Sequence, residues 1–325
     1  MRIGDEADRS GHPPPPRGRV TDGFGATLRL RVEQFAPVLG DVEANVARVA
    51  AAQRDAAADG VHLIVTPELS LTGYDVRDRV HALAVPESPE PYPALAEGPD
   101  VVVGTIERDT AFVPYNAALH LRGGRVLHRH RKVYLPTYGM FDEGRWFGRG
   151  DRARAYDAGG GWRMGVLVCE DLWHPALTYL LAADGAHLVV VQSAAAGRGS
   201  WAGGEGGGRF ASWPAWEHLA RAAAVAYGIY VVIANRVGTE GPGVYAGGSM
   251  VIGPGGDLLA KGDDLGEEQP LVVKHQQPRL DSQKLDRSRQ ILRSCLKFDL
   301  GALSRRRCLH TSTVWWLHSC GAGLD

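Results

Sequence analysis

The chain has 325 residues, of which 44% are hydrophobic and 22% are charged, and its formal net charge at pH 7 is −1. This composition is ordinary for a soluble globular protein and long enough for one large domain or two small ones. The near-neutral balance and the lack of an apolar run of membrane-spanning length predict neither nucleic acid nor a membrane as a partner.

The beginning of the chain predicts no folded structure. Residues 1–26 hold four consecutive prolines with Gly, Arg and Asp and lack the apolar core of a signal peptide, which indicates a disordered lead-in. We therefore expect a cytoplasmic protein with reduced thiols. Cys169 is the only cysteine in the first 294 residues, and no Cys or His spacing suggests a metal site.

Residues 27–274 show alternating strand and helix patterns. In chain order the predicted elements are a strand over 28–32, a helix capped by Asp41 and ending at Gly60, strands over 61–65 and 101–106, a hairpin over 116–131, a strand over 164–168, a helix over 176–183, a strand over 188–191, a helix over 216–227, a strand over 229–234, a hairpin over 249–260 and a strand over 271–273. Alternating strands and helices predict an α/β layered fold, and the hairpins predict mixed sheets. A four-layer α-β-β-α sandwich over 27–274 fits this pattern.

The last part of the chain, 275–325, has a different character. It contains nine Lys or Arg against four acids, three cysteines and no clear strand pattern. We interpret it as an atypical basic tail. A poorly packed extension that wraps a neighbouring subunit, a segment that binds an acidic partner and an out-of-frame reading all fit its composition.

Three predicted strand ends carry side chains suited to catalysis. Glu68 follows the strand over 61–65, Lys132 ends the first hairpin, and Cys169 follows the strand over 164–168. Ligands of α/β folds bind at the carboxyl ends of strands. Taken singly, each residue is better explained by a structural role: Glu68 as a solvated loop acid, Lys132 as part of a basic surface and Cys169 as a core thiol.

Together the three residues can perform acyl chemistry. A thiol needs a base to become the attacking thiolate, and Glu68 can provide it if burial raises its pKa. Lys132 and the backbone N–H of Glu170 can stabilise the oxyanion of a tetrahedral intermediate. The sequence therefore predicts Glu68, Lys132 and Cys169 as a catalytic set that requires no cofactor.

The glycine-rich segment Gly197–Gly208 lacks the strand-to-helix context of a phosphate-binding loop. We expect instead a mobile loop near the site, with Trp201 covering it. The basic run 128–132 resembles a nucleic-acid stripe, but strand alternation divides it between two faces, which favours a charged sheet edge.

The motifs around the three residues resemble the nitrilase, or carbon–nitrogen hydrolase, superfamily, whose signature is a Glu-Lys-Cys triad. Within it they are similar to the glutamine amidotransferase domain of glutamine-dependent NAD synthetases. The matching segments are Pro67–Tyr74, Lys132–Phe147 and Cys169–Trp173. The resemblance implies a nitrilase-like sandwich, and it implies that Tyr74, Tyr138, Phe141 and Glu170 bind substrate.

Two further implications concern single residues. Glu143 is a candidate second acid beside the lysine, although pairing with Arg145 or Arg131 is equally compatible with the sequence. The family's serine-rich segment, which ends in Ser-Pro-Phe and helps to hold glutamine, is only partly matched by Gln192–Arg198. Ser193 is the candidate substrate-binding residue in this segment.

No ATP-pyrophosphatase segment of the Ser-Gly-Gly type follows, so a complete synthetase is not expected. The predicted function is a standalone cysteine amidohydrolase that cleaves a small linear amide through a thioester, releasing ammonia or an amine. The family resemblance implies a homodimer or larger assembly. Three alternatives remain: a glutaminase subunit that supplies ammonia to a separate synthetase partner, an N-acyltransferase, and an inactive scaffold.

Overall fold

The computed structural model describes residues 27–197, 200–201, 209–210, 212–263 and 268–276. The predicted lead-in, the tail beyond residue 276 and most of the glycine-rich segment lie outside the described residues, as does the side chain of Trp201.

The described part of the chain alternates strands and helices in the order that the sequence predicts. The strands are β1 (Thr27–Gln34), β2 (Leu63–Val65), β3 (Val85–Pro86), β4 (Asp100–Arg108), β5 (Pro114–Arg122), β6 (Arg125–Arg131), β7 (Tyr156–Asp157), β8 (Arg163–Val168), β9 (Leu188–Ser193), β10 (Ser200–Trp201), β11 (Arg209–Phe210), β12 (Tyr230–Asn235), β13 (Val237–Glu240), β14 (Gly243–Ala246), β15 (Met250–Ile252), β16 (Leu258–Lys261) and β17 (Gln269–Gln276). The helices are α1 (Val42–Ala58), α2 (Val80–Leu83), α3 (Glu143–Trp146), α4 (Pro175–Ala183) and α5 (Trp213–Tyr227), with 3₁₀ turns η1 (Arg77–Arg79), η2 (Pro93–Leu95) and η3 (Cys169–Trp173).

Two mixed sheets form the centre of the molecule. One has the strand order β17-β1-β2-β4-β5-β6, with β3 added beside β4, and the other has the order β16-β15-β12-β9-β8-β7. Parallel pairing in the middle of each sheet places the carboxyl ends of β2 and β4, and of β8, β9 and β12, at common edges. The predicted hairpins are confirmed as the antiparallel pairs β5–β6 and β15–β16.

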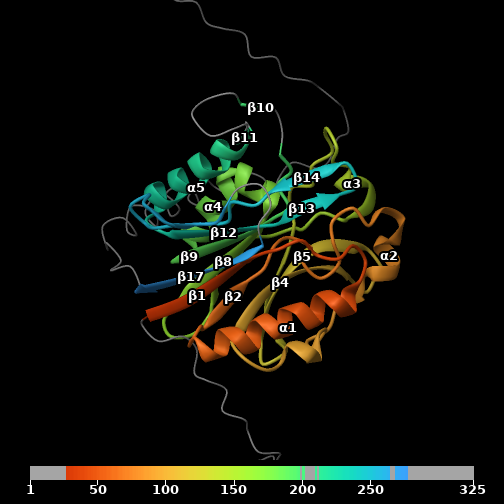
Figure 1. The fold of residues 1–325 in the computed structure, drawn as a ribbon, viewed down its shortest axis with the longest axis horizontal. Helices are drawn as coiled ribbons and strands as arrows, with labels where there is room; N and C mark the ends of the chain where they lie inside the picture. The colour runs from red at the N-terminus through yellow and green to blue at the C-terminus, as the bar shows by residue number, and fades with distance from the viewer. Residues whose placement is uncertain (1–26, 198–199, 202–208, 211, 264–267, 277–325) are drawn as a thin grey trace, which may run out of the picture.

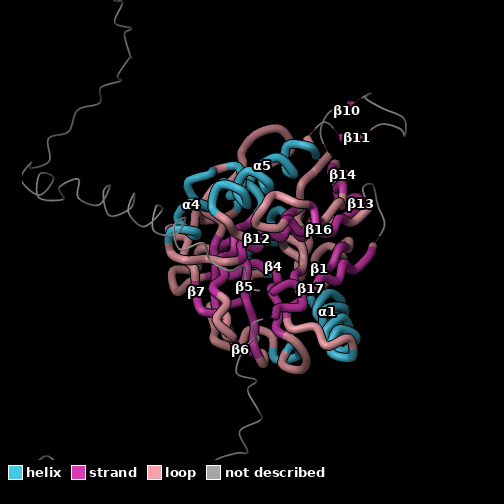
Figure 2. The backbone as a smooth tube through the Cα atoms, turned by 90° about the vertical axis from the view of Figure 1, so that its left-hand side faces the viewer, coloured by secondary structure: helices cyan, strands magenta, loops and turns pink. Residues whose placement is uncertain are grey.

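The layers follow the order α-β-β-α. Helix α1 covers the outer face of the first sheet, and α4 and α5 cover the outer face of the second (Figures 1 and 2). Between the sheets, apolar side chains such as Leu30 and Val32 of β1 share one buried cluster with Val166 of β8 and Val232 of β12. The predicted four-layer sandwich is confirmed.

Local signals also agree with the structure. Asp41 caps α1 by accepting a 3.0 Å hydrogen bond from the backbone N–H of Ala44. Gln53 interrupts the apolar stripe of α1, yet it is buried and donates to the backbone carbonyl of Pro99. Helix α5 begins three residues before its predicted start at Trp216. The small β10–β11 and β13–β14 ribbons were not predicted.

A close backbone approach holds the turn after β2. Leu69 in this turn has a φ of 49°, and a Cβ atom on Gly104 of β4 would lie 2.3 Å from the Leu69 nitrogen and 2.8 Å from the Pro67 carbonyl oxygen. Ser70 ties the same turn to β4 because the backbone N–H of Gly104 donates to its hydroxyl at 3.0 Å. Only glycine fits at position 104 without displacing the turn.

Gly104→Ala should therefore lower the free energy of unfolding by about 1–3 kcal/mol, the usual cost of overpacking. Urea denaturation measures it. Gly253→Ala is the matched control, because the atoms nearest to its added Cβ belong to the flexible side chain of Leu259, the nearest of them at 3.2 Å. Equal stability of the two variants would contradict the close-approach argument.

Candidate active site

The three predicted catalytic residues meet at one end of the two sheets. Glu68 follows β2, Lys132 follows β6, and Cys169 follows β8 as the first residue of η3. Their exposed fractions are 1%, 1% and 7%. All three residues predicted at strand ends are therefore buried. Glu68 and Lys132 follow strands of the first sheet, and Cys169 follows a strand of the second.

Lys132 is held between two carboxylates. Its Nζ donates to Glu68 Oε1 at 2.7 Å and to Glu143 Oε1 at 2.6 Å. The preceding cations point to the opposite face, where Arg129 and Arg131 pair with Glu107. Lys132 is therefore not part of a basic surface.

Glu68 is oriented by two further donors. The side-chain amide of Asn116 on β5 donates to Oε1, and the backbone N–H of Ala194 donates to Oε2, both at 2.8 Å. Sequence reasoning missed Asn116, whose position near the start of β5 carries no motif. With both oxygens fixed, the Glu68 carboxylate has one defined orientation beside Lys132.

Cys169 occupies an unusual backbone conformation for a non-glycine residue, with a φ of 48°. The Ser193 hydroxyl lies 3.6 Å from its Sγ, and the next residue, Ala194, binds Glu68. Burial raises the pKa of the Cys169 thiol well above its usual range, and the nearby carboxylate of Glu68 raises it further while Lys132 opposes the shift. Burial and the Glu68 carboxylate thus both favour the neutral thiol over the thiolate.

Glu143 pairs with Lys132 and not with Arg145 or Arg131. It also accepts a hydrogen bond from the Tyr74 hydroxyl. Burial raises the pKa of Glu143 to about 7, against the opposing effect of Lys132. Burial by itself would lower the pKa of Lys132, but the carboxylates of Glu143 and Glu68 raise it well above the ordinary value, so the lysine stays charged.

A cavity of about 150 Å³ opens onto the thiol. Its lining residues are Pro136, Tyr138, Phe141, Cys169, Glu170, Trp173, Ala195, Ala196, Ser212 and Trp216. Three residues implied by the family resemblance are among them, and the Tyr138 hydroxyl donates to Glu170 Oε2 at 2.7 Å. The cavity is mostly apolar, with Glu170 as its charged side chain among the described residues.

Tyr74 and Ser193 are placed differently. The Ser193 hydroxyl contacts the Cys169 thiol, and Ser193 is not among the residues that line this cavity. Tyr74 lines a second cavity of about 210 Å³, together with Glu143 and Tyr245. An edge-to-face contact between Tyr74 and Phe141, with ring centroids 5.9 Å apart, connects the walls of the two cavities.

Within the described ranges, no group of three or more His, Cys, Asp and Glu side chains is arranged to hold a metal ion. The described helices are also too short or too polar to cross a membrane.

The chain is similar to known carbon–nitrogen hydrolases. The family model named Carbon-nitrogen hydrolase matches residues 29–284. The glutamine-dependent NAD(+) synthetase of Thermotoga maritima is 32% identical over 256 residues, which are 76% of this chain and 42% of that protein. The chain thus spans less than half the length of the curated relatives it matches.

Solved structures agree. An amidase from Nesterenkonia sp. superposes with a TM-score of 0.67 at 28% identity, over 84% of this chain and 98% of that one. Nit3 of Saccharomyces cerevisiae, a member of branch 10 of the nitrilase superfamily, shares the fold with a TM-score of 0.65 at 22% identity, over 86% and 97% of the two chains.

The raised pKa of Glu143 predicts a pH-dependent stability. Between its ordinary value of 4.5 and about 7, the folded protein binds a proton that the unfolded chain lacks. Binding of this proton stabilises the folded state at low pH, and the stabilisation is lost as the pH rises through 7. The stability of the wild type relative to Glu143→Gln should therefore fall between pH 5 and pH 8, as measured by urea unfolding. A difference that is constant or grows with pH would contradict it.

Proposed function

The chain belongs to the carbon-nitrogen hydrolase family, and we propose that it is a cysteine-dependent amidohydrolase that cleaves a small linear amide through a thioester. The observation that carries the proposal is the buried contact of Lys132 with Glu68 beside the buried thiol of Cys169. This arrangement supports a working site more than an inactive scaffold, since an ion pair this deeply buried costs solvation energy.

In the proposed acylation step, Sγ of Cys169 attacks the amide carbonyl carbon while Glu68 accepts the thiol proton. Lys132 and the backbone N–H of Glu170 stabilise the oxyanion, an effect typically worth about 2.7–4 kcal/mol for each donor. Collapse of the tetrahedral intermediate breaks the C–N bond, and Glu68 gives its proton to the leaving ammonia or amine. The product of this half-reaction is a thioester on Cys169.

In the proposed deacylation step, Glu68 accepts a proton from a water molecule that attacks the thioester carbonyl. The C–S bond then breaks, the proton returns to the Cys169 sulfur, and the acid leaves. The reaction is a hydrolysis with no change of oxidation state. The small cavity beside Cys169, with its aromatic and alanine lining, supports a short acyl group as the substrate class.

A second candidate rests on the relatives. Because the curated relatives are glutamine-dependent NAD(+) synthetases and the chain matches less than half of each, we also propose a glutaminase subunit that supplies ammonia to a separate synthetase.

An N-acyltransferase uses the same thioester, and an N-acyl product formed with added amines would distinguish it from a hydrolase.

Cys169→Ala should lower ammonia release from small amides by at least about 10⁴-fold, since removal of a nucleophile abolishes the covalent route. The assay is a screen of small amides, carbamoyl compounds and nitriles. Wild-type protein mixed briefly with substrate should show an acyl adduct on Cys169 by mass spectrometry. An unchanged circular dichroism spectrum is the control for folding, and full turnover by the variant would refute the mechanism.

The glutaminase proposal predicts a different dependence. Glutamine turnover should be slow for the isolated chain and should rise when an ATP-using synthetase from the same source is added. Ammonia release measured with and without that partner tests the prediction. The Cys169→Ala variant, mixed with the same partner, controls for partner activity. Turnover of glutamine that does not respond to the partner would favour the standalone hydrolase.

A further inference from the structure

A fully buried carboxylate lies two residues after the nucleophile, and the proposed chemistry does not use it. Asp171, with 0% exposure, accepts four hydrogen bonds. Oδ1 binds the backbone N–H groups of Val133 at 3.0 Å and Tyr134 at 2.9 Å. Oδ2 binds the backbone N–H of Val168 at 3.1 Å and Nε2 of His130 at 2.8 Å.

The four donors come from the two chain segments that carry the reacting groups. Val168 immediately precedes Cys169 at the end of β8 in the second sheet. His130, Val133 and Tyr134 flank Lys132, at the end of β6 in the first sheet. A single carboxylate therefore ties the nucleophile turn to the lysine segment across the gap between the sheets.

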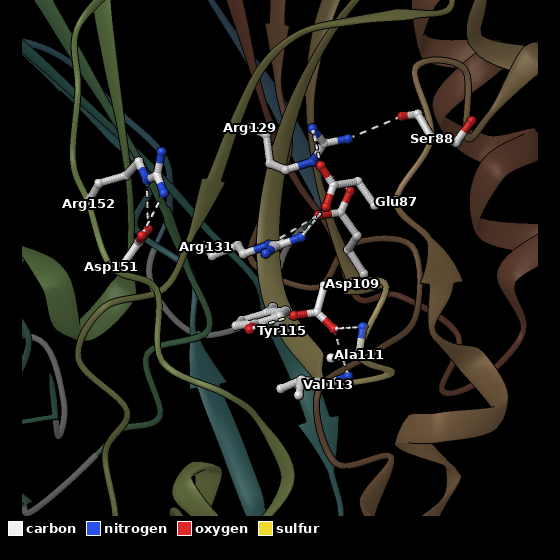
Figure 3. A network of polar contacts seen from close by, with 11 residues as sticks. Glu87, Ser88, Asp109, Ala111, Val113, Tyr115, Arg129, Arg131, Asp151 and Arg152 are labelled. Carbon is white, nitrogen blue, oxygen red and sulfur yellow. Dashed lines mark hydrogen bonds and ion pairs between the residues drawn. The ribbon is translucent and has the colours of Figure 1, made fainter.

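The end of β6 is also held on the face opposite Lys132. Glu107 of β4, also with 0% exposure, accepts from Arg129 Nε at 2.7 Å and from Arg131 at 3.0 Å. Figure 3 shows these two arginines converging on Glu87, which pairs with both. Glu107, Arg129 and Arg131 all belong to strands of the first sheet, and Glu87 follows β3 of the same sheet. Of the two buried carboxylates, Asp171 is therefore the one that also binds the segment of the nucleophile.

The hydrogen bonds of Asp171 hold a strained backbone conformation at Cys169 in place. The left-handed φ of Cys169 persists only where the surrounding structure enforces it, and the hydrogen bond from Val168 N–H to Asp171 closes the turn around that residue. We propose that Asp171, held by His130, is a positioning residue that sets the placement of the Cys169 sulfur relative to Lys132. The inference rests on the proposed function. It assigns no chemical step to Asp171 itself.

The chain offers a matched control for this proposal. His120 and Asp100 form a second buried His–Asp pair in the first sheet, at 3.0 Å. Asp100 also binds Arg122, and the His120 ring binds the Tyr156 hydroxyl. Loss of His120 thus removes a comparable buried hydrogen bond at the amino end of β4, whereas the catalytic candidates follow the carboxyl ends of β2, β6 and β8.

The test measures the rate at which iodoacetamide alkylates Cys169, by mass spectrometry of the peptide that contains this cysteine. The measurement needs no substrate. His130→Ala should slow alkylation and lower kcat about 10- to 100-fold with little change in KM, as expected for a displaced reacting group. His130→Gln, which can still donate to Asp171, should recover most of the rate. His120→Ala should change the alkylation rate less than about 3-fold, because it leaves the four hydrogen bonds to the Asp171 carboxylate in place.

Alkylation of His130→Ala at the wild-type rate, or equal slowing by His120→Ala, would overturn the positioning role. If His130→Ala does not fold, His130→Gln and Asp171→Asn carry the comparison: a normal rate in Asp171→Asn overturns the proposal, and a slow rate with native circular dichroism supports it. A wild-type Cys169 that reacts with neither iodoacetamide nor any amide would refute the proposed function, and the inference with it.

Discussion

The rest of the site depends on one interaction, the burial of the Lys132 ammonium between two carboxylates. Moving a charge out of water is costly, and the contacts of Lys132 Nζ with Glu68 and Glu143 offset that cost. The net effect keeps the lysine charged, because the two carboxylates raise its pKa although burial opposes them. The proposed mechanism uses this positive charge to stabilise the oxyanion.

This interaction constrains the surrounding architecture. The segments that carry Glu68 and Lys132, 64 positions apart, must end within hydrogen-bonding range of each other. Backbone or buried polar groups hold each segment in place. The turn of Glu68 is pressed onto Gly104, and its carboxylate is oriented by Asn116 and the Ala194 N–H. Polar groups buried in this way are costly unless every partner is present, so they specify one arrangement of the chain.

The sequence predicted the elements well, because their signals are local. The stripe and cap of α1, the two glycine-centred hairpins and the apolar runs of β2, β8 and β12 are each visible within a window of a few residues. The catalytic candidates followed from that pattern, since Glu68 and Cys169 each stand directly after a predicted strand. The family motifs then identified Tyr138, Phe141 and Glu170, which line the cavity beside the thiol.

What the sequence by itself determined was the order of strands and helices and the identity of the residues at the strand ends, because periodicity and turn chemistry are properties of neighbouring residues. Only the tertiary structure decided that Glu143 pairs with Lys132, that Tyr74 lines a second cavity together with Glu143, and that Asp171 binds segments of both sheets. Apart from the turn contact between Val168 and Asp171, these contacts join residues 11 to 69 positions apart. Such contacts arise when two sheets pack face to face, and no local pattern encodes which buried donor will meet which acceptor.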